Sequence, residues 1–177
     1  MSRPLVLLVD DEPNVTSALK RQLRSEPYEI VEATSARAAL GILAERDVHV
    51  VVSDEMMPGL SGSELIAQIR HDYPAVIRII LSGQASLDAV LRAINQGEVY
   101  RFLTKPCNSV DLASTIRNAL DYHAVLAENR SLRHTVAEQR RVLADLDERY
   151  PGISTVERDS DDAVLIDADD AFDLSKM

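Results

Sequence analysis

Five short stretches of apolar, mostly β-branched residues recur between residues 5 and 103, and a stretch that suits an amphipathic helix follows each of them. These apolar stretches are residues 5–9, 28–31, 48–52, 77–81 and 99–103. Stretches such as residues 48–52 lack the alternation of apolar and polar positions found in a strand with one solvent-exposed face, which indicates strands buried on both faces. The pattern predicts a doubly wound α/β domain over residues 4–122, with a five-stranded parallel sheet in (βα)5 order between layers of helices.

Polar residues typical of helix starts support this order. Ser61 is followed three residues later by Glu64, as in a capping box. Ser35 and Ser86 each precede a stretch with helical apolar periodicity, so we expect them to cap the second and fourth helices.

The fifth helix should be much longer than the sheet needs, because it begins near Asn108 and meets neither proline nor glycine before Pro151. From residue 122 a 3-4 spacing places these residues on one face: Tyr122, Val125, Asn129, Leu132, Val136, Gln139, Leu143, Leu146 and Tyr150. The spacing predicts a coiled-coil helix over residues 122–150. The alternative is a single amphipathic helix that folds back on its own domain.

Polar residues of this helix indicate how two copies would pair. Asn129 stands at an a position, where a buried Asn fixes the register and favours a parallel two-stranded pair. Glu128 at g and Arg133 at the next e position can form an ion pair between chains. We therefore expect a homodimer through this helix.

Composition narrows the possible settings. Apolar residues make up 46% of the 177 residues, enough to bury a core, and no apolar run approaches the ~20 residues of a membrane helix. The net charge of -10 disfavours a nonspecific nucleic-acid clamp. The chain starts without a cleavable leader and has one cysteine, Cys107, so we expect a cytoplasmic protein that binds neither membrane nor nucleic acid.

The negative charge is concentrated at one end. Residues 151–177 contain eight acids and two bases, which gives -6 there and leaves -4 for residues 1–150. We expect this acidic tail to be either solvated and disordered or a short hairpin of residues 153–156 and 163–166.

Chemically useful side chains follow the predicted strands. They are Asp10 and Asp11 after the first strand, Asp54 after the third, Ser82 after the fourth and Lys105 after the fifth. Ligands of such sheets bind beyond the carboxyl ends of the strands, so we expect these residues at one edge. Three carboxylates repel one another unless a cation neutralises them, and an all-oxygen cluster suits Mg²⁺. A hydroxyl and an ammonium group beside it complete a pocket for a phosphoryl group.

Four segments resemble the receiver domain of two-component response regulators. They are residues 5–13, 53–59, 82–83 and 102–106. The resemblance covers residues 4 to about 122 and implies a flavodoxin-like fold. It also implies that Asp54 accepts a phosphoryl group from a histidine kinase or phosphotransfer protein. Asp10 and Asp11 would hold Mg²⁺ together with Asp54 and the main-chain carbonyl of Met56.

The resemblance assigns further roles near the acceptor. Lys105 would pair with the phosphoryl oxygens, Ser82 would move to hydrogen-bond one of them, and Phe102 occupies the aromatic switch position. Two residues beyond the acceptor, many relatives carry a polar side chain, whereas this chain has Met56. At the matching position after Ser82 it has Gln84. We therefore expect slow loss of the phosphoryl group.

These features predict a response regulator that modifies only itself and is otherwise not an enzyme. No helix-turn-helix module, Walker-type loop or zinc-ligand cluster follows residue 122, so output should pass through protein contacts to a partner that the sequence does not identify. One alternative is an aspartyl-nucleophile phosphohydrolase, although Glu12 stands where such enzymes commonly have a second Asp. Another is a coiled-coil adaptor with an inactive receiver, against which the complete acid set argues.

Overall fold

The computed structural model describes residues 3–83 and 99–150, and it divides the chain into two units, Met1–Glu128 and Asn129–Met177, which are described separately. The strands of the first unit are β1 (Leu5–Val9), β2 (Glu29–Ala33), β3 (Val50–Asp54), β4 (Ile77–Ser82) and β5 (Arg101–Thr104). The helices are α1 (Pro13–Gln22), α2 (Ala36–Glu45), α3 (Gly62–Asp72) and α5 (Ser109–Arg149), the last of which has residues in both units. The predicted fourth helix with Ser86, Gln84 and the acidic tail lie outside the described residues.

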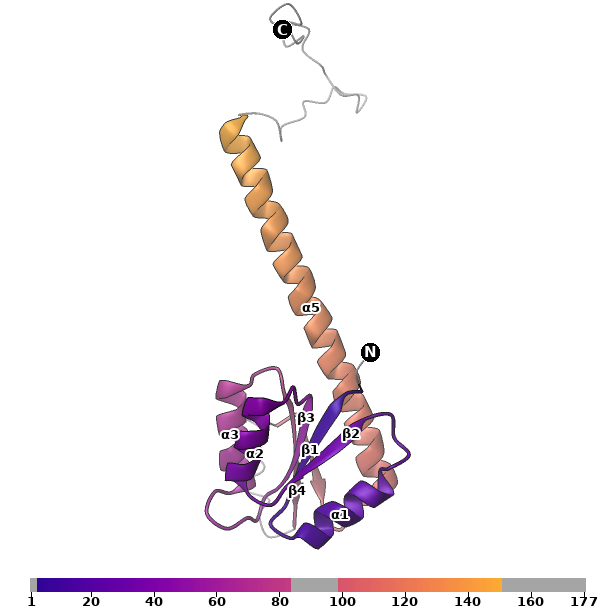
Figure 1. Ribbon diagram of the computed structural model, residues 1–177. Helices are drawn as coiled ribbons and strands as arrows, with labels where there is room; N and C mark the ends of the chain where they lie inside the picture. Colours follow the sequence, from indigo (N-terminus) through magenta and orange to yellow (C-terminus); the bar gives the residue numbers. More distant parts are fainter. Residues whose placement is uncertain (1–2, 84–98, 151–177) are drawn as a thin grey trace, which may run out of the picture. The chain divides into compact units, whose positions relative to one another are not determined.

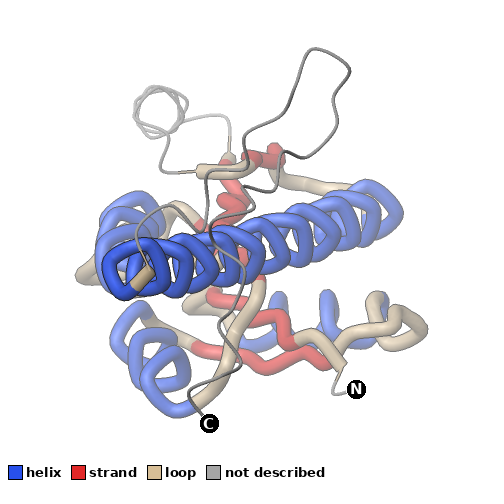
Figure 2. Tube along the Cα trace, turned by 90° about the horizontal axis from the view of Figure 1, so that it is seen from above, coloured by secondary structure: helices blue, strands red, loops and turns tan. Residues whose placement is uncertain are grey.

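The five strands form one parallel sheet in the order β2-β1-β3-β4-β5. Figure 1 labels β1, β2, β3 and β4 of this sheet. The predicted doubly wound α/β fold is confirmed. In β1, Leu5, Leu7 and Val9 belong to the apolar cluster shared with α2 and α3, whereas Val6 and Leu8 belong to the cluster shared with α1 and the start of α5. Helices therefore cover both faces of the sheet. Figure 2 draws the helices in blue and the strands in red.

Burial follows the position of each strand in the sheet. Every residue of the central strands β1 and β3 is buried, while the edge strands β2 and β5 are partly exposed. The third strand was expected over residues 48–52, but its ladder runs from Val50 to Asp54. Val48 is buried but does not belong to the ladder. The prediction began the strand too early because an apolar run indicates burial and does not indicate which residues pair with a neighbouring strand.

Two predicted helix caps are confirmed. The Ser35 hydroxyl oxygen accepts a hydrogen bond from the Ala38 amide at 3.2 Å. Ser61 and Glu64 form both halves of a capping box at the start of α3. The cap fixes where α3 begins, directly after the loop that follows β3.

The predicted long C-terminal helix is also confirmed, since α5 contains 41 residues. In its second-unit part the side chains of Leu132, Val136 and Leu143 are exposed, and Leu146 is partly exposed. Among the described residues, no helix combines the length and hydropathy that crossing a membrane requires.

Candidate functional site

Three carboxylates meet at the carboxyl edge of the sheet. Asp10 and Asp11 follow β1, and Asp54 is the last residue of the neighbouring strand β3. Because Val9 lies opposite Ser53 in the parallel ladder, the residues that follow them reach the same edge. One oxygen from each of the three side chains lies within 4.8 Å of the others. Asp10 is 2% exposed and Asp54 6% exposed, so this charge is concentrated in a poorly hydrated place.

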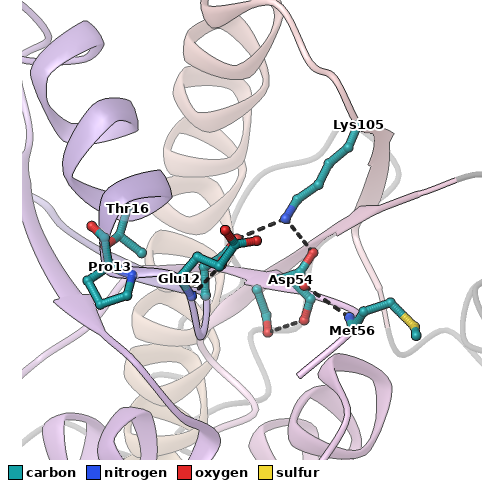
Figure 3. Close-up of polar contacts among 8 residues, drawn as sticks. Glu12, Pro13, Thr16, Asp54, Met56 and Lys105 are labelled. Carbon is teal, nitrogen blue, oxygen red and sulfur yellow. Dashed lines mark hydrogen bonds and ion pairs between the residues drawn. The ribbon is translucent and has the colours of Figure 1, made fainter. Parts of the chain in front are cut away.

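Lys105 connects two of these carboxylates. Its Nζ lies 2.8 Å from Oδ2 of Asp10 and 2.6 Å from Oδ1 of Asp54 (Figure 3). Burial alone would lower the pKa of the Lys105 ammonium group, but its hydrogen bonds and charge attraction to the two aspartates outweigh burial, and the pKa is raised. The ammonium group therefore stays charged.

The backbone holds the other oxygen of each buried carboxylate. Oδ1 of Asp10 accepts a hydrogen bond from the Glu12 amide at 2.9 Å, and Oδ2 of Asp54 accepts one from the Met56 amide at 3.1 Å (Figure 3). Each carboxylate is thus bound by Lys105 at one oxygen and by the loop that follows it at the other. The Met56 side chain itself is 68% exposed.

The site has the charge and the donor atoms for one divalent cation. Three carboxylates and one ammonium group leave a net charge of -2. Carboxylate oxygens are hard ligands of the kind that Mg²⁺ prefers. Asp10, Asp11 and Asp54 therefore fit a magnesium site, and Asp11, the most exposed of them, lies on its solvent side.

Ser82 and Phe102 lie on the strands beyond β3. Ser82 is buried at the end of β4, opposite Thr104 of β5, and its hydroxyl donates to the carbonyl oxygen of Gly83 at 3.0 Å. Phe102 is partly buried and packs against the apolar cluster shared with α2 and α3. Both residues are on the expected elements, and their roles as switch residues stay predictions.

Sequence reasoning missed two residues that join β3 to α3. Glu55 is buried, and its Oε2 accepts hydrogen bonds from the amide and hydroxyl of Ser63 at 2.9 and 2.8 Å. Gly62 lies so close to β3 that a Cβ there would collide with the backbone carbonyl of Asp54. The available signal was the glycine between Ser61 and Ser63, in a helical turn that does not itself need one.

The first residue of the predicted coiled-coil face has a contact within its own domain. Tyr122 stacks on Tyr100, which precedes β5, with ring centroids 5.3 Å apart. The neighbouring His123 lies against His49, with ring centroids 4.8 Å apart. The pairing of Asn129, Leu132, Val136, Leu143 and Leu146 with a second copy stays a prediction.

Known proteins share this arrangement over most of the chain. Residues 6–117 match the family model described as the response regulator receiver domain. The hydrogenase transcriptional regulatory protein HoxA of Cupriavidus necator is 33% identical over 116 residues, which cover 66% of this chain and 24% of that protein. The transcriptional regulatory protein GlrR of Escherichia coli is 34% identical over 151 residues, which cover 80% of this chain and 34% of that protein. The chain thus spans about a third or less of the length of these relatives.

Solved structures agree. The signal receiver domain of an HD domain-containing protein from Pseudomonas fluorescens Pf-5 is 37% identical, with a TM-score of 0.68, and the match covers 72% of this chain and 94% of that one. A response regulator receiver domain protein from Clostridium thermocellum is 31% identical, with a TM-score of 0.66, over 70% of this chain and 98% of that one. The matched family segment includes the acid cluster and Lys105. This chain belongs to the receiver-domain family of two-component response regulators.

Proposed function

We propose that this chain is a response regulator that accepts a phosphoryl group on Asp54 from a phosphohistidine of a kinase or phosphotransfer protein. One observation carries the proposal: the buried Asp54 carboxylate lies against the Lys105 ammonium and within 4.8 Å of two further carboxylates. An acid in these surroundings has a counter-charge ready for an incoming phosphoryl group of about -1.5 to -2 charge.

The transfer requires one bond to form and one to break. An oxygen of Asp54 bonds to phosphorus while the bond from phosphorus to the donor histidine nitrogen breaks, and that nitrogen takes a proton from water. Lys105, which is 2.6 Å from Oδ1, then pairs with a phosphoryl oxygen, and the Ser82 hydroxyl moves from Gly83 to donate to another. Mg²⁺ held by Asp10, Asp11, Asp54 and the Met56 carbonyl would neutralise negative charge on the phosphoryl group.

The same geometry favours self-modification over turnover of a small substrate. Glu12, which stands where a phosphohydrolase commonly has its second Asp, is exposed at the N-cap of α1. We therefore propose stoichiometric chemistry, with one phosphoryl group per chain, in which the protein modifies itself and no other molecule.

Intact-mass analysis of the full chain with acetyl phosphate tests this proposal. We expect one added phosphoryl group in the presence of Mg²⁺, none with a chelator, and none for Asp54→Asn. Asp72→Asn, which removes an exposed acid at the end of α3, serves as the matched control and should label normally. Labelling of Asp54→Asn at the wild-type rate contradicts the site. Steady hydrolysis of a phosphate ester without accumulation supports the phosphohydrolase, and absence of labelling supports the inactive adaptor.

Partners follow from the same family. Sensor kinase CckA of Brucella abortus is 37% identical over 118 residues, which cover 66% of this chain and 12% of that protein, so a protein named as a sensor kinase contains a segment similar to this chain. We propose a histidine kinase as donor, a cytoplasmic setting, and output through protein contacts. We further propose a parallel homodimer through residues 122–150. The side chains of Leu132, Val136 and Leu143 are exposed, and their burial against a second helix would stabilise the dimer.

A further inference from the structure

The second-unit part of α5 has a hollow on one side, which we call the arginine hollow. It is lined by Asn129, Leu132, Arg133, Val136, Ala137 and Arg140. Its lining combines three apolar side chains with the two arginine side chains. Among the described residues, neither Arg133 nor Arg140 takes part in an ion pair. In the proposed parallel dimer, Arg133 would meet Glu128 of the second copy, but Arg140 would face the uncharged Thr135.

The same chain carries a segment of opposite charge. Residues 129–141 contain four arginines and one glutamate, a net charge of +3. Residues 159–174 contain seven aspartates, no base and eight apolar residues, among them Leu165, Ile166 and Phe172. This segment therefore combines the two properties that the arginine hollow selects for, negative charge and apolar side chains.

The connection between them is long enough. Residue 140 lies about 15 Å and residue 133 about 26 Å along the helix from residue 150, at 1.5 Å per residue. The eight residues 151–158 span up to about 26 Å when extended, and Pro151 and Gly152 directly after the helix suit a reversal of direction. The spacing of charges also agrees: Arg133 and Arg140 are about 10.5 Å apart along the axis, and aspartates three residues apart in an extended segment are about 10 Å apart.

We propose that residues 159–174 bind in the arginine hollow of their own chain, with aspartates on Arg133 and Arg140 and apolar side chains on Leu132 and Val136. Asn129, Leu132 and Val136 also belong to the face assigned to the second helix. The acidic segment and a second copy therefore compete for one surface, and the acidic tail restrains dimerisation. The restraint rests on the proposed dimer, whereas the binding of the tail does not.

A photo-crosslinker at Ala137 tests the occupant of the arginine hollow directly. The full chain with p-benzoylphenylalanine at this position is prepared unlabelled and ¹⁵N-labelled, mixed in equal amounts, irradiated and mapped by mass spectrometry. At protein concentrations below the dimer dissociation constant, we expect crosslinks to residues 159–174 that never join the two labels. Asp167→Asn/Asp170→Asn/Asp173→Asn should reduce their yield several-fold. Asp145→Asn/Asp147→Asn/Glu148→Gln, which changes the net charge equally on the helix itself, should not.

Two results would overturn the binding of the tail. One is the lack of any crosslink to residues 159–174, and the other is mixed-label crosslinks to α5 that the tail variant does not change, which would make the second copy the occupant. Sedimentation then tests the restraint: neutralising the three aspartates should tighten the dimer about tenfold, as expected for several surface charge pairs together. An unchanged dimer constant refutes the restraint. If both the wild type and the triple aspartate variant are monomers, the proposed dimer is refuted. The crosslinking result still tests whether residues 159–174 bind in the arginine hollow.

Discussion

The ammonium group of Lys105 lies between two buried carboxylates, so its removal should change stability as well as signalling. We expect Lys105→Gln to lower the free energy of unfolding without Mg²⁺ by about 1–3 kcal/mol, because Asp10 and Asp54 are left facing each other without a counter-charge. Urea unfolding measures this. Lys20→Gln is the control, since it breaks an exposed ion pair with Glu32 and should cost less than about 1 kcal/mol. Equal losses in the two variants would contradict the role of Lys105.

If Asp54 carries a phosphoryl group, as proposed, we expect the side chain of Met56 to affect how long that group lasts. Met56 is exposed beside the acceptor and gives an attacking water no hydrogen bond. We expect Met56→Asn to speed loss of the phosphoryl group about fivefold, the rate equivalent of one hydrogen bond of ~1 kcal/mol. The decay of labelled protein in a chase with unlabelled buffer gives the rate, and Met56→Leu should match the wild type. An Asn variant that decays no faster refutes this expectation.

Tyr28 should make stability fall at high pH. Its hydroxyl is buried and makes no hydrogen bond within the described residues. Burial, then the charge of Glu26, raises the pKa of the Tyr28 hydroxyl above its ordinary value of 10.0, and Arg117 only partly opposes this. The folded state therefore holds the Tyr28 proton more tightly than the unfolded state does. The contribution of this proton to the free energy of unfolding is fully present below pH 10 and decreases as the pH rises above 10.

The measurement compares Tyr28→Phe with the wild type by urea unfolding between neutral pH and pH 11. At neutral pH the variant should be no less stable than the wild type. It removes a buried hydroxyl without a hydrogen bond in the described part of the chain, whose burial costs about 1 kcal/mol or more. Above pH 10 its advantage should grow, because Phe does not titrate. Parallel curves over the whole range would show that Tyr28 does not ionise in this window.

At the scale of elements, the contact between β3 and α3 fixes the backbone of Asp54, the proposed acceptor. We expect Gly62→Ala to destabilise the protein by at least about 2 kcal/mol, as overpacking against backbone does, and to slow labelling of Asp54, whose carbonyl must move. Gly41→Ala is the control in α2, where a Cβ meets nothing within 4 Å, and it should stabilise the helix by roughly 0.5–1 kcal/mol. Melting and labelling are measured on both. A Gly62→Ala protein that melts like wild type would contradict the close approach.

How much of this could be read from the sequence depended on whether the signal was local. The capping box at Ser61 and the burial of residues 5–9 depend on neighbouring positions, and both were predicted. The end of β3 was placed too early, because its last pairs are set by β1 and β4. The bond of Glu55 to Ser63 and the approach of Gly62 to Asp54 require a tertiary arrangement that no local pattern encodes. The edge where the acids meet was predictable since parallel strands share a direction.

At the scale of the whole molecule, the question is how many copies act together. We expect a dimer at micromolar concentration that Leu143→Asp/Leu146→Asp converts to a monomer, because two buried charges per helix oppose pairing. Light scattering measures this. Ala144→Asp, an exposed position off the predicted seam, should remain dimeric. A chain that is monomeric both as wild type and as Asp167→Asn/Asp170→Asn/Asp173→Asn would remove the coiled coil from the proposed function. A dimer that survives the double substitution would place the interface elsewhere.

The order of the strands also determines when the site comes into existence. Asp10 and Lys105 are 95 residues apart in the sequence, and β5, which leads into Lys105, adds to the sheet only at the β4 edge. During translation the ribosome therefore releases both carboxylate-bearing strands well before the strand that precedes their counter-ion. A nascent or truncated chain that lacks β5 and Lys105 holds Asp54, the proposed acceptor, without the ammonium group beside it. Such a fragment should fail as a phosphoryl acceptor even if a kinase can reach it. We therefore expect incomplete chains not to be phosphorylated.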